Sequence, residues 1–187
     1  MSALPLDPPA PADTGRRQAV LESALVTFVR FGYRKTSMDD VAKAAHISRP
    51  GLYFLFDSKK ALFRAAVSHA LERDLEVIAR ELADAALPLK SRLIAAFDHW
   101  GGGYIGPLTI EVPGFTAEDP ALLVDILDSA PRRFETLVTD AVAGSYAGDA
   151  AQRAQTVISA SIGIKHQVAS REDYLAKLTI ALDVILA

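Results

Sequence analysis

The residues best suited to bind a polyanion lie between Thr36 and Phe63. A tight turn over residues 45–48 precedes Arg49, Pro50 and Gly51, and an aromatic cluster follows them. An arginine at the front of a short helix can bond guanine O6 and N7 together, and a proline can contact a thymine methyl group. These residue types in this order favour readout of bases in a DNA groove.

The elements that must position these residues are two short helices. Ser37 is a suitable N-cap for the first, with Asp40 three residues on, and Ser48 is a suitable N-cap for a helix from about Arg49 to Phe54. Two short helices joined by a tight turn form a helix-turn-helix, whose second helix enters the major groove. A helical hairpin with no DNA role remains the alternative at this point.

Charge is divided unevenly along the chain. Residues 16–64 contain ten Lys/Arg and four Asp/Glu, which gives 10 − 4 = +6, and residues 65–187 contain ten and seventeen, which gives 10 − 17 = −7. Asp7 and Asp13 supply the rest of the net charge of −3. A basic head on an acidic body indicates a polyanion-binding domain joined to a domain with another task.

The remaining pattern predicts an all-α protein of about nine helices, in which a long helix from about Ser58 joins a three-helix head to a C-terminal helical bundle. Residues 1–15 hold four prolines and are expected to form a disordered arm. The head is predicted over residues 16–63 and the body over residues 64–187. The first helix should start at Arg16 and end before Gly32. Later helices are expected over residues 89–100, near Pro120, at Pro131 and around Ala150.

A set of residues across the head resembles the DNA-binding domain of the TetR family. The set is Gly32-Tyr33, Thr36-Ser37, Val41-Ala42, Ala45, Ile47-Ser48, Leu52-Tyr53, Phe56, Ser58-Lys59 and Leu62. The resemblance implies a homodimeric transcriptional regulator, usually a repressor that a small molecule releases from a palindromic operator. It implies that Arg49, Pro50 and Gly51 read bases and that Thr36, Tyr53 and Lys59 hold phosphates. The full predicted DNA-binding set is Thr36, Ser37, Ser48, Arg49, Pro50, Gly51, Tyr53, Phe54 and Lys59.

Three positions depart from the family pattern. His46 stands where the family usually has glycine, and we expect the turn to persist because imidazole tolerates a left-handed backbone better than a β-branched side chain. Leu55 replaces a polar ring, which would remove a phosphate contact. Asp39 lies near the start of the first short helix, where an acid would repel the DNA backbone.

An aromatic group midway through the body is the candidate small-molecule site. Trp100 and Tyr104 flank a glycine-rich break, and aromatic walls with few polar groups suit an apolar ligand. The predicted ligand-binding set is Phe97, Trp100, Tyr104, His99, Phe115 and His166. The alternative is that these side chains are core or surface residues, and that is the preferred interpretation of Phe97.

Other chemistries lack a matching pattern. The string from Gly101 to Gly106 fits G-x-G-x-x-G, but a helical stretch precedes it and Pro107 follows, so it indicates a helix end rather than a nucleotide site. Ser161 lies within a helical apolar stripe and should be packed. The histidines are too far apart for a metal site, and no cofactor or catalytic group is indicated. The chain has no cysteine, no run long enough to span a membrane and no signal sequence, which predicts a cytoplasmic protein that is not an enzyme.

The last two helices are the predicted dimer interface. One carries a face of small residues and the other a face of leucines, and a two-fold four-helix contact would bury both (Ala154, Ser161, Leu175, Leu178 and Leu182). Closure of the monomer's own core is the alternative. A rival for the whole chain is a helical module that binds a small molecule or a protein and carries a vestigial head.

Overall fold

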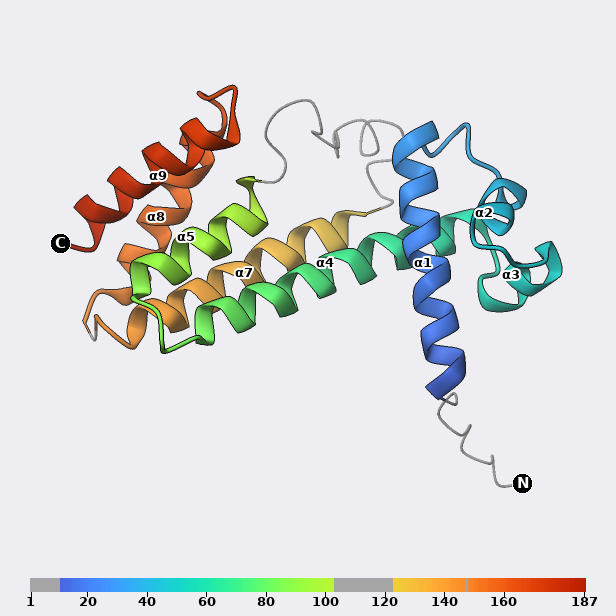
Figure 1. The fold of residues 1–187 in the computed structure, drawn as a ribbon, viewed down its shortest axis with the longest axis horizontal. Coiled ribbons are helices and arrows are strands. Elements are labelled where there is room, and N and C mark those ends of the chain that lie inside the picture. Colours follow the sequence, from blue (N-terminus) through green and yellow to red (C-terminus); the bar gives the residue numbers. More distant parts are fainter. Residues whose placement is uncertain (1–10, 103–122, 147) are drawn as a thin grey trace. The chain divides into compact units, whose positions relative to one another are not determined.

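The computed structural model describes residues 11–102, 123–146 and 148–187 (Figure 1). Within those ranges all regular structure is helical, in eight helices, which confirms the all-α prediction. None of these helices is long and apolar enough to cross a membrane. The predicted arm lies mostly outside the described residues, as do Tyr104 and Phe115.

The chain divides into two compact units, Met1–Ala70 and Leu71–Ala187. We call the first unit the head and the second the body. Helix α4 (Lys59–Ala83) contributes to both, so the division falls within a helix. The sequence boundary at residues 63 and 64 therefore lies inside the same helix as the structural one.

The head contains α1 (Pro11–Phe31), α2 (Met38–Ala44), α3 (Arg49–Leu55) and the first turns of α4. Helix α1 begins before the predicted start at Arg16, so residues 11–15 are helical rather than part of an arm. Pro11 is the first helical residue, a position where the missing N–H of proline is harmless. Phe28, Leu52 and Phe63 are almost fully buried, and the rings of Phe28 and Phe63 meet edge to face at 5.0 Å between centroids.

Local hydrogen bonds set the limits of the short helices as predicted. Ser37 and Asp40 form a capping box, in which the Asp40 amide donates to Ser37 Oγ and the Ser37 amide donates to the Asp40 carboxylate. The Gly51 amide donates to Ser48 Oγ at 3.2 Å and caps α3. His46 adopts a left-handed φ of 53°, so the turn between α2 and α3 persists without glycine.

The body contains the rest of α4 with α5 (Leu89–Trp100), α7 (Val124–Ala143), α8 (Ala150–Lys165) and α9 (Arg171–Ile185). Helix α8 packs against both α7 and α9, and α9 also packs against α5 (Figure 1). The helix predicted over residues 89–100 is confirmed. Pro131 does not begin a helix as expected but lies inside α7. Buried Ala130 and Phe134 on either side of it show that packing holds the helix together despite the lost backbone hydrogen bond.

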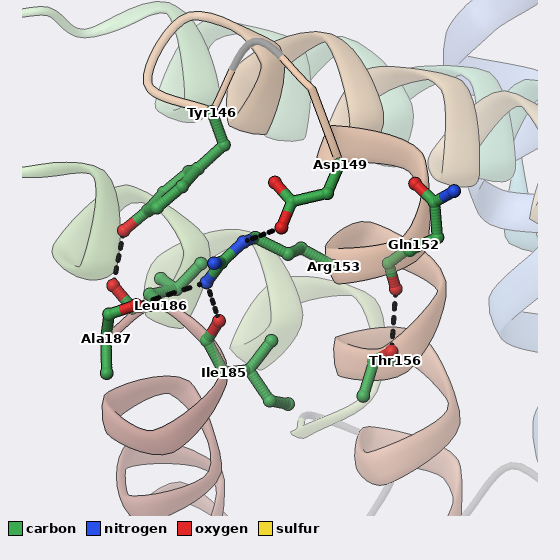
Figure 2. Close-up of polar contacts among 8 residues, drawn as sticks. All are labelled: Tyr146, Asp149, Gln152, Arg153, Thr156, Ile185, Leu186 and Ala187. Carbon is green, nitrogen blue, oxygen red and sulfur yellow. Dashed lines mark hydrogen bonds and ion pairs between the residues drawn. The ribbon is translucent and has the colours of Figure 1, made fainter.

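The C-terminal end of α9 is held by α8 (Figure 2). The guanidinium of Arg153 donates to the carbonyls of Ile185 and Ala187 and to the carboxylate of Asp149, and the Tyr146 hydroxyl donates to the Leu186 carbonyl. The carbonyls at the end of a helix have no partners within it, so these donors satisfy them. They fix the end of α9 against the start of α8.

The faces predicted to form the dimer interface are instead mostly buried within one chain. Ala154, Leu178 and Leu182 are fully buried, and Ser161 is 7% exposed. Ser161 is packed as predicted, with its Oγ 2.7 Å from the Tyr174 hydroxyl. The alternative interpretation of these faces, as the monomer's own core, is therefore the correct one.

Candidate nucleic-acid interface

The outer face of α3 presents side chains that the fold itself does not need. Leu52 points inward and is fully buried, whereas Arg49 and Pro50 are exposed, Tyr53 is 41% exposed and Phe54 is 85% exposed. The Arg49 guanidinium lies over the Tyr53 ring at 5.7 Å from its centroid. The face therefore combines a cation, a proline and two aromatic rings on a seven-residue helix.

Four residues of the predicted DNA-binding set are engaged within the head. Thr36 is only 2% exposed and its hydroxyl donates to the Gly32 carbonyl. Ser37 and Ser48 are occupied in the caps of α2 and α3. Lys59 Nζ lies 3.0, 3.4 and 3.1 Å from the carbonyls of Tyr33, Arg34 and Thr36 and above the Tyr33 ring.

The predicted DNA-binding set thus divides into residues that stabilise the head and residues that remain exposed for recognition. The ammonium of Lys59 has three hydrogens and faces three carbonyl oxygens. Lys59 therefore holds the segment between α1 and α2 and is not free to contact a phosphate. The buried hydroxyl of Thr36 has the same internal role. The exposed part of the predicted set is thus Arg49, Pro50, Tyr53 and Phe54, with half-buried Gly51 beside it.

Three other charged groups shape the electrostatics around α2. Asp39 pairs with Lys43 at 2.6 Å, and their hydrogen bond raises the pKa of the Lys43 amine. A neighbouring cation reduces the repulsion that Asp39 alone would exert on phosphates. Hydrogen bonds from the Ser37 side chain and amide lower the pKa of Asp40, so its carboxylate stays ionised at the N-terminus of α2.

The four candidate ligand residues that the structure describes do not form one cluster. Phe97 is core, 1% exposed, and meets Phe134 edge to face at 5.1 Å. The Trp100 ring also stacks on Phe134, with 4.7 Å between the ring centroids and 7° between the planes. His99 lies 3.6 Å from Asp74, whereas His166 is exposed at the end of α8.

Polar contacts link the end of α5 to α8 and α9. The Tyr174 hydroxyl is 2.7 Å from Ser161 Oγ and 3.4 Å from the Phe97 carbonyl, and burial raises the pKa of the Tyr174 phenol. The guanidinium of Arg171 binds the Asp98 carboxylate through Nε and Nη2. Among the described residues no group of three or more His, Cys, Asp or Glu side chains could hold a metal ion.

Residues 20–66 match the family model described as "Bacterial regulatory proteins, tetR family". The head thus matches the TetR family, and the match lies wholly within it. The biofilm operon negative transcriptional regulator IcaR of Staphylococcus aureus is 35% identical over 51 residues, which is 27% of either chain. The HTH-type regulator YhgD of Bacillus subtilis is 34% identical over 73 residues, or 39% of this chain and 38% of YhgD. The matched segment thus spans well under half of these relatives.

Solved structures extend the likeness in fold to most of the chain. Escherichia coli NemR in its reduced form has a TM-score of 0.72 at 16% identity and covers 90% of this chain and 97% of its own. A regulator from Saccharomonospora viridis in complex with choline has a TM-score of 0.71 at 19% identity, covering 91% and 96%. At such identities the likeness concerns the fold alone.

Sequence reasoning overlooked two residues that matter in the body. Phe134 was not among the candidates, although the spacing by four of Ala130, Phe134, Val138 and Val142 marks the buried stripe of α7. Tyr174 also carries no local sequence signal, because its partners are Ser161 and the Phe97 carbonyl.

Proposed function

We propose that this protein is a transcriptional regulator that binds a palindromic DNA operator as a homodimer and represses until a small molecule releases it. The observation that carries the proposal is the exposed face of α3, where Arg49, Pro50, Tyr53 and Phe54 form no hydrogen bond or ion pair with side chains of the other described elements. The Ser48 cap and the left-handed turn at His46 fix the start of that helix, and Lys59 holds the segment between α1 and α2. IcaR, which resembles the head, is itself described as a negative regulator.

Each exposed side chain has a role that suits DNA. The Arg49 guanidinium can bond guanine O6 and N7 together, and Pro50 can contact a thymine methyl group. The Tyr53 hydroxyl can donate to a phosphate, and the Phe54 ring adds apolar contact at the groove edge. One short helix binds weakly, so we propose that two heads, about 34 to 36 Å apart, enter successive major grooves.

The dimer needs a different surface from the one the sequence suggested. On α8 and α9 the exposed apolar side chains are Ile162 (56%), Ile180 (64%) and Val184 (74%), which lie away from the buried faces of the same helices. We propose that these residues form the two-fold contact, still through the last two helices. Ile180→Glu should convert dimer to monomer in sedimentation velocity, whereas Val26→Glu, at a 66% exposed position in the head, should not.

The proposed effector site is the aromatic group of the body around Trp100. A ligand that binds one state of the dimer better than the other would shift the population between DNA-competent and incompetent forms. Choline is one compound to test, because a protein of this fold holds it. A compound that bound tightly but left operator affinity unchanged would contradict this part of the proposal.

The function is tested by selecting duplexes from a randomised 30-base-pair pool and measuring anisotropy at about 150 mM salt, where non-specific contacts weaken. We expect an enriched palindrome, and Arg49→Ala should lose preference at one base pair of each half-site, at about 1 to 3 kcal/mol. Arg133→Ala, exposed in the body, is the charge-matched control. Failure to enrich any sequence would support the rival, a ligand- or protein-binding module with a vestigial head.

A further inference from the structure

Arg16 on α1 lies beside the first turn of α3. A Cβ placed on Gly51 would be 3.9 Å from Arg16 Nη2 and 3.1 Å from Ser48 Oγ. The side chain of Arg16 therefore reaches the flank of the helix whose outer face carries Arg49 and Tyr53. We infer that Arg16 is a further DNA contact of the head, one that binds a phosphate at the edge of the groove that α3 enters. This inference rests on the proposed function.

Arg16 is available for such a contact. It is exposed, and no hydrogen bond or ion pair joins it to another part of the described chain. Its neighbour Arg17 differs, because that guanidinium lies over the Phe56 ring at 4.6 Å. Lys59, the cation that the family resemblance assigned to phosphate, is bound to three backbone carbonyls. Arg16 thus supplies a free cation where Lys59 does not.

The position favours a phosphate rather than a base. The proposed base-reading residues of α3 are Arg49 and Pro50, which are exposed, whereas Gly51 is half-buried beside them. A guanidinium beside Gly51 would meet the DNA strand that borders the groove, where phosphate oxygens are exposed. A guanidinium can bind two of those oxygens in parallel, and such contacts fix the register of a protein on DNA without reading sequence.

The structure also explains why Arg16 was overlooked. The sequence placed it at the very start of the first helix, after an arm without basic residues. Because α1 begins at Pro11, Arg16 lies within the helix and its backbone is fixed. The guanidinium lies so close to α3 that a Cβ on Gly51 would be in van der Waals contact with it, at 3.9 Å.

The test compares Arg16→Gln with Arg30→Gln, which removes the same charge from an exposed position of α1. Fourteen positions separate them, or about 21 Å along the helix. Affinity is measured by anisotropy at several salt concentrations, on the unselected 30-base-pair pool and on the duplex that the wild-type protein enriches. Each lost phosphate contact should reduce the slope of log affinity against log salt by about 0.9, hence by about 1.8 for two heads.

We expect Arg16→Gln to show the shallower slope on both DNAs with unchanged base preference, Arg16→Lys to restore most of it, and Arg30→Gln to match wild type. Equal slopes for the two glutamine variants would overturn the inference while leaving the proposed function intact. A changed base preference at constant slope would overturn the phosphate assignment. If wild type enriches no sequence, the proposed function fails, and the unselected pool still decides whether Arg16 contacts phosphate.

Discussion

The head and the body are each stabilised by contacts of a different range along the sequence. In the head the caps join residues three positions apart, Ser37 with Asp40 and Ser48 with Gly51. In the body Asp98 binds Arg171, 73 positions away, and Tyr174 reaches the Phe97 carbonyl across 77. The comparison shows that a recognition helix can be built largely from local signals, whereas a helical bundle depends on pairings that only the fold creates.

The difference also separates exposed from buried aromatic residues. Phe54 of the head is 85% exposed, and Phe134 of the body is 2% exposed between Phe97 and Trp100. The first is available to a partner, and the second is part of the buried core of the body. Replacement by alanine should therefore reduce stability at Phe134 and partner binding at Phe54.

The largest effect is expected from Phe134→Ala. Removing a buried ring between Phe97 and Trp100 should lower the free energy of unfolding of the body by about 3 to 5 kcal/mol. Urea unfolding followed by the fluorescence of Trp100, the single tryptophan of the sequence, measures this directly. Phe54→Ala is the control and should change stability by less than about 0.5 kcal/mol while weakening DNA binding. Equal stability losses would contradict the comparison.

Lys59→Met tests the long-range hydrogen bonds that hold the segment between α1 and α2. The substitution keeps the length of the side chain but leaves the carbonyls of Tyr33, Arg34 and Thr36 without their donor. Hydrogen bonds to charged groups contribute about 1.5 to 3 kcal/mol, and we expect a loss of about 2 kcal/mol by circular dichroism in urea. Lys35→Met, at an exposed lysine of the same segment, should be close to neutral. A neutral Lys59→Met would return that lysine to the set of candidate phosphate contacts.

Gly102→Ala probes close packing at the end of α5. A Cβ on Gly102 would lie 2.3 Å from Asp98 Oδ1, so the carboxylate must move away from Arg171. Because that carboxylate can rotate, we expect a loss of only about 1 kcal/mol, at the low end for overpacking. Gly163→Ala in α8 meets nothing within 4 Å and should stabilise by a similar amount. Thermal melts of the two variants should thus shift in opposite directions.

The smallest effect is a change in pH dependence. Hydrogen bonds from Ser37 lower the pKa of Asp40 in the folded head, so their stabilisation is present above the unfolded value of about 3.9 and is lost as pH falls through the folded value. Ser37→Ala should therefore lower Tm more near pH 6 than near pH 2.5. Ser159→Ala, exposed on α8, should show no such dependence. An equal decrease in Tm at both pH values would show that the contribution of the Ser37 cap does not depend on the ionisation of Asp40.

Sequence reasoning succeeded where the causes are local. Both caps, the left-handed turn at His46 and the helix from Leu89 to Trp100 follow from residue types within a few positions of one another. It failed at Pro131 because proline was given more weight than the buried stripe around it.

At the candidate site, sequence reasoning failed where the decisive contacts join residues far apart in the sequence. Lys59 and Thr36 resemble phosphate contacts by their positions in the sequence. The carbonyls that bind Lys59 in the structure lie 23 to 26 positions away from it, and Thr36 is buried only in the folded head. Arg16 and Gly51 are 35 positions apart, so no spacing rule connects them. The two faces assigned to the dimer are apolar in either case, and sequence cannot say which partner buries them.

The hydrogen bonds of Lys59 bear on its chemical reactivity. An amine held by the carbonyls of Tyr33, Arg34 and Thr36, with the Tyr33 ring at 4.5 Å, must break those bonds before it can attack an acylating reagent. The acyl group would then have to fit a half-buried position. Reagents that modify lysines on an exposed surface should therefore leave Lys59 largely unmodified while the head is folded, and its modification would report the opening of the segment between α1 and α2.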